Sequence, residues 1–154
     1  MRLYRIAEGK FAHDLSGEGA RLYGGRWNPK GIPMIYTADS VALAALEVLV
    51  RLATPKHYFR VTYEIPERVS METVAVADLP SNWLLPHPNA HLIEFGGRWS
   101  RERRSLLLQV PSTVVRGEGW NYLINPHHPE FPLVIVADSA PFDYDFRLLG
   151  RKSN

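Results

Sequence analysis

The sequence contains no cysteine, carries little excess charge of either sign and has no long apolar run. Without thiols, the chain can form neither a disulfide framework nor a thiolate metal site, which fits a reducing compartment. The longest apolar run covers residues 41–46, whereas a transmembrane helix needs about 20 apolar residues. Residues 1–10 contain no signal-peptide apolar segment. The sequence therefore predicts a cytoplasmic protein with no membrane association.

The basic excess is small, with a formal net charge of +2 and a pI near 9.0. Its densest stretch, residues 98–104, carries four Arg and one Glu. A nucleic-acid-binding surface needs a larger basic face, so we expect no direct nucleic-acid partner and only a weak preference for phosphate-bearing ligands. A length of 154 residues with 45% apolar content predicts one compact domain, residues 1–154, around one core.

Short apolar and alternating runs separated by Pro and Gly predict an α+β fold in which strands dominate, with antiparallel or mixed sheets. We expect strands at 3–7, 33–37, 57–65, 74–77, 105–110, 133–137 and 142–149. The runs 105–110 and 133–137 are continuously apolar, which is typical of central strands.

Two helices are predicted between these strands. One is capped by Asp39 or Ser40 and runs to about residue 52, where Thr54-Pro55 ends it. The other covers 89–99, with Pro88 in its first turn. Residues 9–31 are rich in glycine and are expected to be mostly loop.

The most informative stretch runs from residue 24 to residue 47. It places Arg26 in a Gly-rich turn, Tyr36 in a short strand and Glu47 inside an otherwise apolar helix. Arginine offers a planar fork for phosphate, tyrosine offers an aromatic face, and a carboxylate on an apolar face is costly unless it is paired or borders a cleft. On three consecutive elements, these groups could line one cleft that suits an anionic, ring-bearing ligand such as a nucleotide.

Each of these residues also has a purely structural interpretation. Glu47 could form an ion pair with Arg51 at i+4 on the helix margin. Arg26 could stack on Trp27 or lie in water, and Tyr36 could be a core aromatic with its hydroxyl at the edge. The sequence leaves both interpretations open.

Other polar residues give weaker signals. Ser112 follows a predicted strand without a G-x-S-x-G elbow, so it is a binding hydroxyl or a loop cap rather than a nucleophile. Residues 121–126 (NYLINP) read as a turn-prone segment, whose two amides could orient a loop or a ligand. The histidines have no third partner at a zinc-like spacing, so we expect no metal, and neither a dinucleotide fingerprint nor a P-loop is present.

Taken together, the motifs resemble the RES domain. The run GEGARLYGGRWNPKG…IYTADSVALAALE is followed by LLLQVPS and NYLINPHHPEF, and the resemblance extends from LYRIA to FDYDFRLL. The family is named for Arg, Glu and Ser positions, which here are Arg26, Glu47 and Ser112. We interpret the second GGRW, at residues 96–99, as coincidental helix-end chemistry and not as a second site.

The resemblance implies a fold similar to that of ADP-ribosyltransferase toxins of the diphtheria kind. It implies the toxin half of a bacterial toxin–antitoxin pair that depletes NAD and forms a hetero-oligomer with an Xre-like helix-turn-helix antitoxin covering its active site. NAD would be the substrate, and no cofactor is expected. The acceptor could be water, inorganic phosphate or a protein side chain.

The same resemblance implies a role for each site residue. Glu47 would stabilise an oxocarbenium-like ribose, Tyr36 would stack on the nicotinamide, and Arg26 would hold phosphate or ribose oxygens. Arg5 would be a second phosphate clamp, and the pocket would be shaped by Ser112 and Asn125. Two alternatives stay open: a protein-modifying ADP-ribosyltransferase, and a non-enzymatic nucleotide-binding module.

Overall fold

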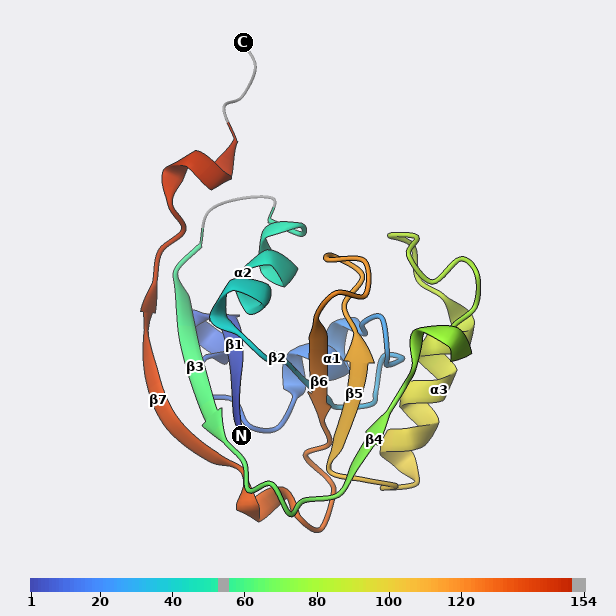
Figure 1. The fold of residues 1–154 in the computed structure, drawn as a ribbon. Helices are drawn as coiled ribbons and strands as arrows, with labels where there is room; N and C mark the ends of the chain where they lie inside the picture. The colour runs from blue at the N-terminus through green and yellow to red at the C-terminus, as the bar shows by residue number, and fades with distance from the viewer. Residues whose placement is uncertain (53–55, 151–154) are drawn as a thin grey trace.

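The computed structural model describes residues 1–52 and 56–150 and has an α+β fold built on a seven-stranded mixed sheet (Figure 1). The strands follow the order β4-β5-β6-β2-β1-β3-β7. Their bounds are β1 Arg2–Glu8, β2 Ile35–Ala38, β3 Tyr58–Glu64, β4 Met71–Thr73, β5 Leu107–Pro111, β6 Trp120–Ile124 and β7 Ile135–Phe142. The α-helices of the described residues are α1 Glu18–Tyr23, α2 Val41–Leu49 and α3 Ala90–Arg101.

The sheet is weakly joined at its middle. Strand β1 pairs with β3 along its whole length, but its register with β2 consists of the single pair Tyr4↔Ala38. On the other side, β2 pairs with β6 over all four of its residues. Figure 1 shows β1, β3 and β7 on the left and β4, β5 and β6 on the right, with α2 between the two halves and α3 at the right edge.

The central strand β5 confirms the prediction for residues 105–110. It lies between β4, which is parallel to it, and β6, which is antiparallel. Leu107, Leu108 and Val110 are all fully buried, because the core continues on both faces of this strand. A strand buried on both faces needs no polar alternation, which is why its sequence is a continuous apolar run.

The sequence predicts a central strand at residues 133–137, and this prediction is wrong. The run enters β7, an edge strand in which Ile135 is 59% exposed. An apolar run indicates that a segment is hydrophobic, but it does not indicate whether one or two strands pair with that segment in the sheet. The predicted closing strand 142–149 is also wrong, because β7 ends at Phe142 and the 3-10 helix η4, Phe146–Leu149, follows.

One further strand prediction and one turn prediction differ from the structure. The expected strand 74–77 is replaced by β4, which ends at Thr73, and by the 3-10 helix η2, Val76–Asp78. The turn-prone segment 121–126 is instead mainly the strand β6. Two further 3-10 helices, η1 Gly9–Phe11 and η3 Phe131–Leu133, lie in connections between other elements.

Helices α2 and α3 each begin at a side-chain cap. The Ser40 hydroxyl accepts a hydrogen bond from the Leu43 N–H (3.1 Å) and starts α2, as predicted, while Thr54-Pro55 lies outside the described residues. Asn89 caps α3 by accepting from the N–H groups of His91 and Leu92, so Pro88 lies ahead of the cap and not in the first turn. No helix in the described part of the chain is long and apolar enough to cross a membrane.

The six-residue helix α1 lies within the stretch that the sequence predicts to be loop. It is flanked by Gly17 and Gly24, both in the left-handed region with φ of 72° and 71°. These glycines allow the chain to turn sharply into and out of a very short helix. Because the segment is rich in glycine, its sequence predicts a loop and not this helix.

Candidate functional site

A cavity of about 300 Å³ opens where the two halves of the sheet are weakly joined. Its walls come from β1, α1 and the turn after it, β2, α2 and one residue of β6. Arg5, Tyr36 and Glu47 line it, so the fold brings residues from three of the predicted elements into one space.

Packing of α2 directs Glu47 into this cavity. Leu43 and Ala44 are buried against Ile6 and Ala38 of the sheet, and Glu47 follows one turn later on the adjoining face. Its Oε1 accepts hydrogen bonds from the Ser112 hydroxyl (2.6 Å) and the Asn121 amide (2.6 Å). Oε2 accepts none from the described residues. One carboxylate oxygen is therefore fixed by the protein, and the other is left for a ligand.

The structural interpretation of Glu47 can be compared directly with this geometry. Among the described residues, Glu47 and Arg51 are not within ion-pair distance, although both line the cavity. Glutamate at i and arginine at i+4 is the favourable helical orientation for a pair. The two short hydrogen bonds from Ser112 and Asn121 hold the carboxylate elsewhere.

Ser112 acts through Glu47. It is fully buried at the end of β5, and its backbone is fixed by hydrogen bonds to Gly119 and from Gly117. Its hydroxyl donates to the carboxylate, so it restricts the rotation of Glu47. Ser112 therefore contacts Glu47 and does not itself line the cavity.

The ring and the hydroxyl of Tyr36 make different contacts. The hydroxyl accepts from the Trp27 N–H (3.0 Å) and donates to Asn28 Oδ1 (2.7 Å), and burial raises the pKa of Tyr36. The hydroxyl is therefore a structural tie to the turn that carries Arg26, whereas the ring lines the cavity. A Cβ at Gly25 would lie 2.5 Å from this hydroxyl, so the turn requires glycine there.

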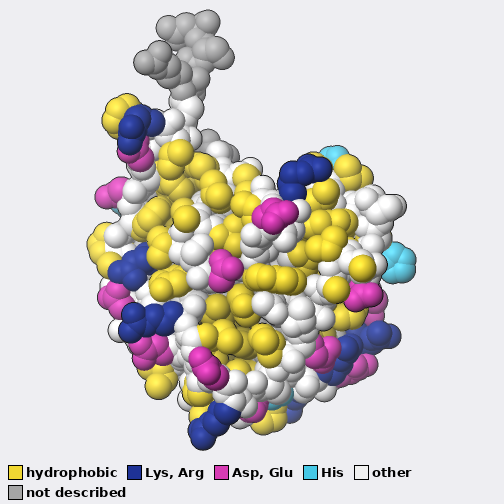
Figure 2. Space-filling model, viewed as in Figure 1, with side chains coloured by type: hydrophobic (Ala, Val, Ile, Leu, Met, Phe, Trp, Pro, Cys, Tyr) yellow, Lys and Arg dark blue, Asp and Glu magenta, His cyan; other side chains and the backbone are white. Residues whose placement is uncertain are grey.

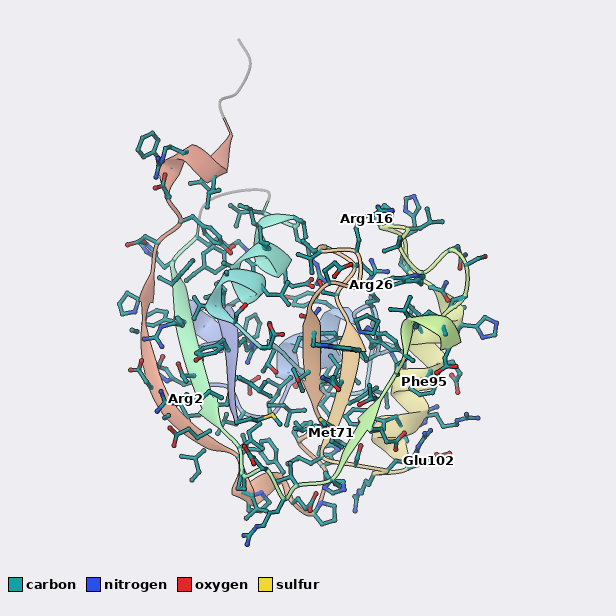
Figure 3. The ribbon with its side chains drawn as sticks, in the orientation of Figure 1. Arg2, Arg26, Met71, Phe95, Glu102 and Arg116 are labelled. Carbon is teal, nitrogen blue, oxygen red and sulfur yellow. The ribbon has the colours of Figure 1, made fainter. Side chains whose placement is uncertain are left out.

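Arg26 lies beside the cavity without being part of its immediate wall. Its Nη1 donates to the carbonyls of Trp83 and Leu85 (3.1 Å each), which hold the guanidinium on the loop before α3. Burial and the nearby Arg51 lower the pKa of Arg26, while Glu47 raises it. Figure 3 shows Arg26 on the same upper edge of the molecule as Arg116, which comes from the β5–β6 loop.

The neighbouring Trp27 faces away from this edge. It is buried, and its ring meets Phe95 of α3 edge-on, with centroids 6.2 Å apart. The turn thus places a core anchor and a cation at adjacent positions.

Of the two remaining predicted site residues, Arg5 lies at the cavity and Asn125 does not. Arg5 lines the cavity and donates to the Asp14 carbonyl (3.3 Å). Asn125 does not reach the cavity, because its amide donates to the Ser100 carbonyl (2.9 Å) and accepts from the His127 N–H (3.0 Å). It joins α3 to the end of β6, and the amide at the cavity is Asn121.

Several polar and aromatic residues of the wall were not predicted as site residues, among them Tyr23, Arg51 and Asn121. Arg51 had a usable signal, because its i+4 spacing from Glu47 places both on one side of α2. Asn121 is one of the two amides of the 121–126 segment that could orient a ligand, but the resemblance pointed to the other one, Asn125. In residues 1–52 and 56–150, no cluster of three His, Asp or Glu side chains could hold a metal ion.

The chain is an α+β protein with a cavity that Arg5, Tyr36 and Glu47 line, and comparison with known proteins identifies its family. The chain belongs to the RES domain family, whose model matches residues 2–145. It is 38% identical over 145 residues to the "Prs ADP-ribosylating toxin" of Sphingobium sp. (strain YBL2), covering 91% of this chain and 89% of that protein.

Two further comparisons concern a mycobacterial relative. A stretch of 35 residues is 60% identical to the "NAD(+) phosphorylase MbcT" of Mycobacterium tuberculosis (strain ATCC 25618 / H37Rv), covering 22% of this chain and 19% of that one. The structure matches a chain of the M. tuberculosis MbcT-MbcA toxin-antitoxin complex with a TM-score of 0.70 over 92% of this chain and 83% of that chain. At 23% identity, this match shows the shared fold alone.

Proposed function

We propose that this protein is the toxin of a toxin–antitoxin pair and cleaves the bond between nicotinamide and ribose in NAD. Two relatives support an NAD-consuming reaction, one named an ADP-ribosylating toxin and the other an NAD(+) phosphorylase. The proposed activity fits a location in the bacterial cytoplasm, where NAD is shared by many enzymes.

The observation that carries the proposal is the half-satisfied carboxylate of Glu47. Oε1 is fixed by Ser112 and Asn121, while Oε2 has no partner among the described residues in a cavity that Tyr36 also lines. A fixed negative charge of this kind stabilises positive charge that develops at a reacting centre, because it is already oriented before the reaction.

The chemistry follows from that charge. When the bond from C1′ to the ring nitrogen breaks, its electron pair stays on nicotinamide, which leaves as a neutral molecule. Positive charge then develops on the ribose, and Glu47 stabilises it more in the transition state than in the ground state. The Tyr36 ring provides a stacking face, and Arg26 and Arg5 provide cations for the anionic part of the substrate.

We propose hydrolysis or phosphorolysis as the outcome, so that an oxygen of water or inorganic phosphate bonds to C1′ and loses its proton to solvent. A second candidate is transfer of ADP-ribose to a protein side chain, which the name of the Sphingobium relative favours. Purified protein incubated with NAD distinguishes these outcomes. Free ADP-ribose indicates hydrolysis, a phosphorylated ADP-ribose that forms only with added phosphate indicates phosphorolysis, and added mass on a target protein indicates transfer.

Replacement of Glu47 tests the role of its charge. Glu47→Gln keeps an oxygen that can accept from Ser112 and Asn121, so the fold should survive. Nicotinamide release should fall by about 100-fold or more, which corresponds to about 2.7 kcal/mol of transition-state stabilisation. Expressed in bacteria, the wild-type chain should arrest growth and lower NAD, whereas the variant should do neither.

Glu94→Gln is the matched control, because Glu94 is an exposed residue of α3 whose partner is Arg101. It should behave as the wild type does. A fully active Glu47→Gln variant would return Glu47 to a structural role. Growth arrest without loss of NAD would favour modification of a target, and tight NAD binding without turnover would favour a binding module.

We propose an Xre-like helix-turn-helix antitoxin as the partner. The fold match to a chain of a toxin-antitoxin complex supports an antitoxin of some kind. The cavity cations favour an inhibitor that brings a carboxylate-bearing segment to the edge on which Arg26 lies.

A further inference from the structure

Arg51 continues the cavity wall beyond Glu47. The helix α2 ends at Leu49, but Arg51 N–H donates to the Val48 carbonyl (3.0 Å), so the chain makes a further turn. Four residues at 1.5 Å each place Arg51 about 6 Å beyond Glu47 along this direction. A spacing of that order matches the span of one ribose.

The charge of Arg51 is not neutralised locally. Seven arginines of the described residues are paired with a carboxylate, as Arg2–Glu64, Arg21–Glu18, Arg60–Asp138, Arg98–Glu102, Arg101–Glu94, Arg104–Glu72 and Arg147–Asp145. Arg68, Arg103 and Arg116 form no ion pair with the described residues. Figure 2 shows this mixture of basic and acidic side chains across one face. Arg5, Arg26 and Arg51 also form no ion pair with the described residues, and these three lie together at or beside the cavity.

The cavity therefore carries excess positive charge. Arg5 and Arg51 line it together with a single carboxylate, that of Glu47. The field of Arg51 also reaches the neighbouring groups, because it lowers the pKa of Arg26 and opposes the burial-driven rise in the pKa of Tyr36. Guanidinium groups held this way, without a protein anion, suit a ligand that brings its own negative charge.

We propose that Arg51 binds the diphosphate of a dinucleotide and thereby sets the direction in which the substrate lies in the cavity. The reacting ribose lies at Glu47, and the phosphates lie one turn further along α2. This inference rests on the proposed function and adds a substrate subsite to it.

The end of α2 makes a cation necessary at this point. The last carbonyls of a helix carry partial negative charge, which would repel a phosphate placed beside them. A guanidinium just beyond the helix end offsets that charge and offers two parallel N–H donors to phosphate oxygens. An uncharged residue at position 51 would leave the diphosphate next to the negative end of the helix.

The test compares ligands with and without phosphate. ADP-ribose binding is measured by calorimetry for the wild type, Arg51→Gln, Arg51→Lys and the control Arg98→Gln, whose residue lies on the exposed face of α3. Loss of one charged hydrogen-bond partner should weaken ADP-ribose binding about 10- to 100-fold in Arg51→Gln. Arg51→Lys should fall between, because lysine keeps the charge without the fork, and Arg98→Gln should match the wild type.

A second readout separates a subsite from a general structural effect. Nicotinamide riboside contains the scissile bond but no phosphate, so Arg51→Gln should lower kcat/KM for NAD and leave that for nicotinamide riboside unchanged. The thermal midpoint should also be unchanged, because the Arg51 side chain forms no hydrogen bond or ion pair with the described residues, and the substitution keeps the backbone hydrogen bond to Val48.

Equal losses on both substrates, or unaltered ADP-ribose affinity, would overturn the assignment. If the wild type releases no nicotinamide at all, the proposed function fails, and the ADP-ribose titration still decides the role of Arg51.

Discussion

At the residue scale, Tyr36 shows how one side chain serves both the fold and the site. Its hydroxyl ties down Trp27 and Asn28, and its ring faces the cavity. The sequence leaves open whether this tyrosine is a core aromatic or a ligand surface, and the structure combines the two. Burial raises the pKa of Tyr36, and its hydroxyl donates to Asn28 Oδ1.

Substitutions at Tyr36 should separate these functions. Tyr36→Phe keeps the ring but leaves Trp27 N–H and Asn28 Oδ1 without their partner, so stability should fall by about 1–3 kcal/mol with most activity retained. Tyr36→Ala also removes the ring and should lower stability by about 3–5 kcal/mol and activity much further. Denaturant unfolding and NAD turnover measure the two effects.

The matched control is Tyr122→Phe. The Tyr122 hydroxyl accepts from Gln109 and does not belong to the cavity wall, so the activity of this variant should be unchanged. Equal loss of activity in Tyr36→Phe and Tyr36→Ala would mean that the hydroxyl, by holding the turn of Arg26, matters and the ring does not.

At the element scale, helix α3 supports the turn that carries Arg26. A Cβ at Gly96 would lie 2.0 Å from the Trp27 carbonyl oxygen, and one at Gly97 would lie 2.9 Å from Pro29. Both glycines are buried where the helix meets the turn. The second GGRW is therefore neither a second site nor helix-end chemistry, because its glycines permit close packing and Trp99 is fully buried.

Gly96→Ala should force α3 and the turn apart. Because the obstructing atom is backbone, overpacking should cost about 1–3 kcal/mol of unfolding free energy and should lower activity by displacing Arg26. Gly9→Ala is the control, since its Cβ would meet its nearest neighbour, the Phe59 ring, at an ordinary 3.5 Å. Denaturant unfolding and NAD turnover would check both, and a Gly96→Ala variant as stable and active as the wild type would refute the support role of α3.

At the scale of the whole molecule, the weak junction between β1 and β2 creates the cavity. The two halves of the sheet meet at one registered pair, and Arg5, Tyr36 and Glu47 reach the opening from β1, β2 and α2. A cavity open to solvent in an enzyme that consumes NAD requires control, which the proposed antitoxin would supply.

We expect the antitoxin to compete with NAD for this opening. The complex should bury a standard interface of about 1,600 Å² or more, and its nicotinamide release should fall far below that of the free protein. Titrating antitoxin against NAD turnover measures the competition. A stable complex that degrades NAD at the free rate would contradict occlusion and leave transcriptional repression as the control.

The sequence alone determined features that depend on near neighbours along the chain. The Ser40 cap, the apolar helix around Glu47, the doubly buried β5 and the family motifs are all local patterns, and each predicts its element. The sequence also predicted that Arg26, Tyr36 and Glu47 would lie near one another, because they stand on consecutive elements and such elements tend to lie side by side.

Only the tertiary structure decided which distant segments meet. The edge position of β7, the choice of Asn121 over Asn125, and the hydrogen bonds of Ser112 and Asn121 to one oxygen of Glu47 depend on strand pairing between residues far apart in the chain. The contact of Gly96 with the Trp27 turn depends likewise on how α3 packs. The periodicity of the sequence does not predict such contacts. The free energy that stabilises them comes from apolar burial, which exists only once the sheet has formed.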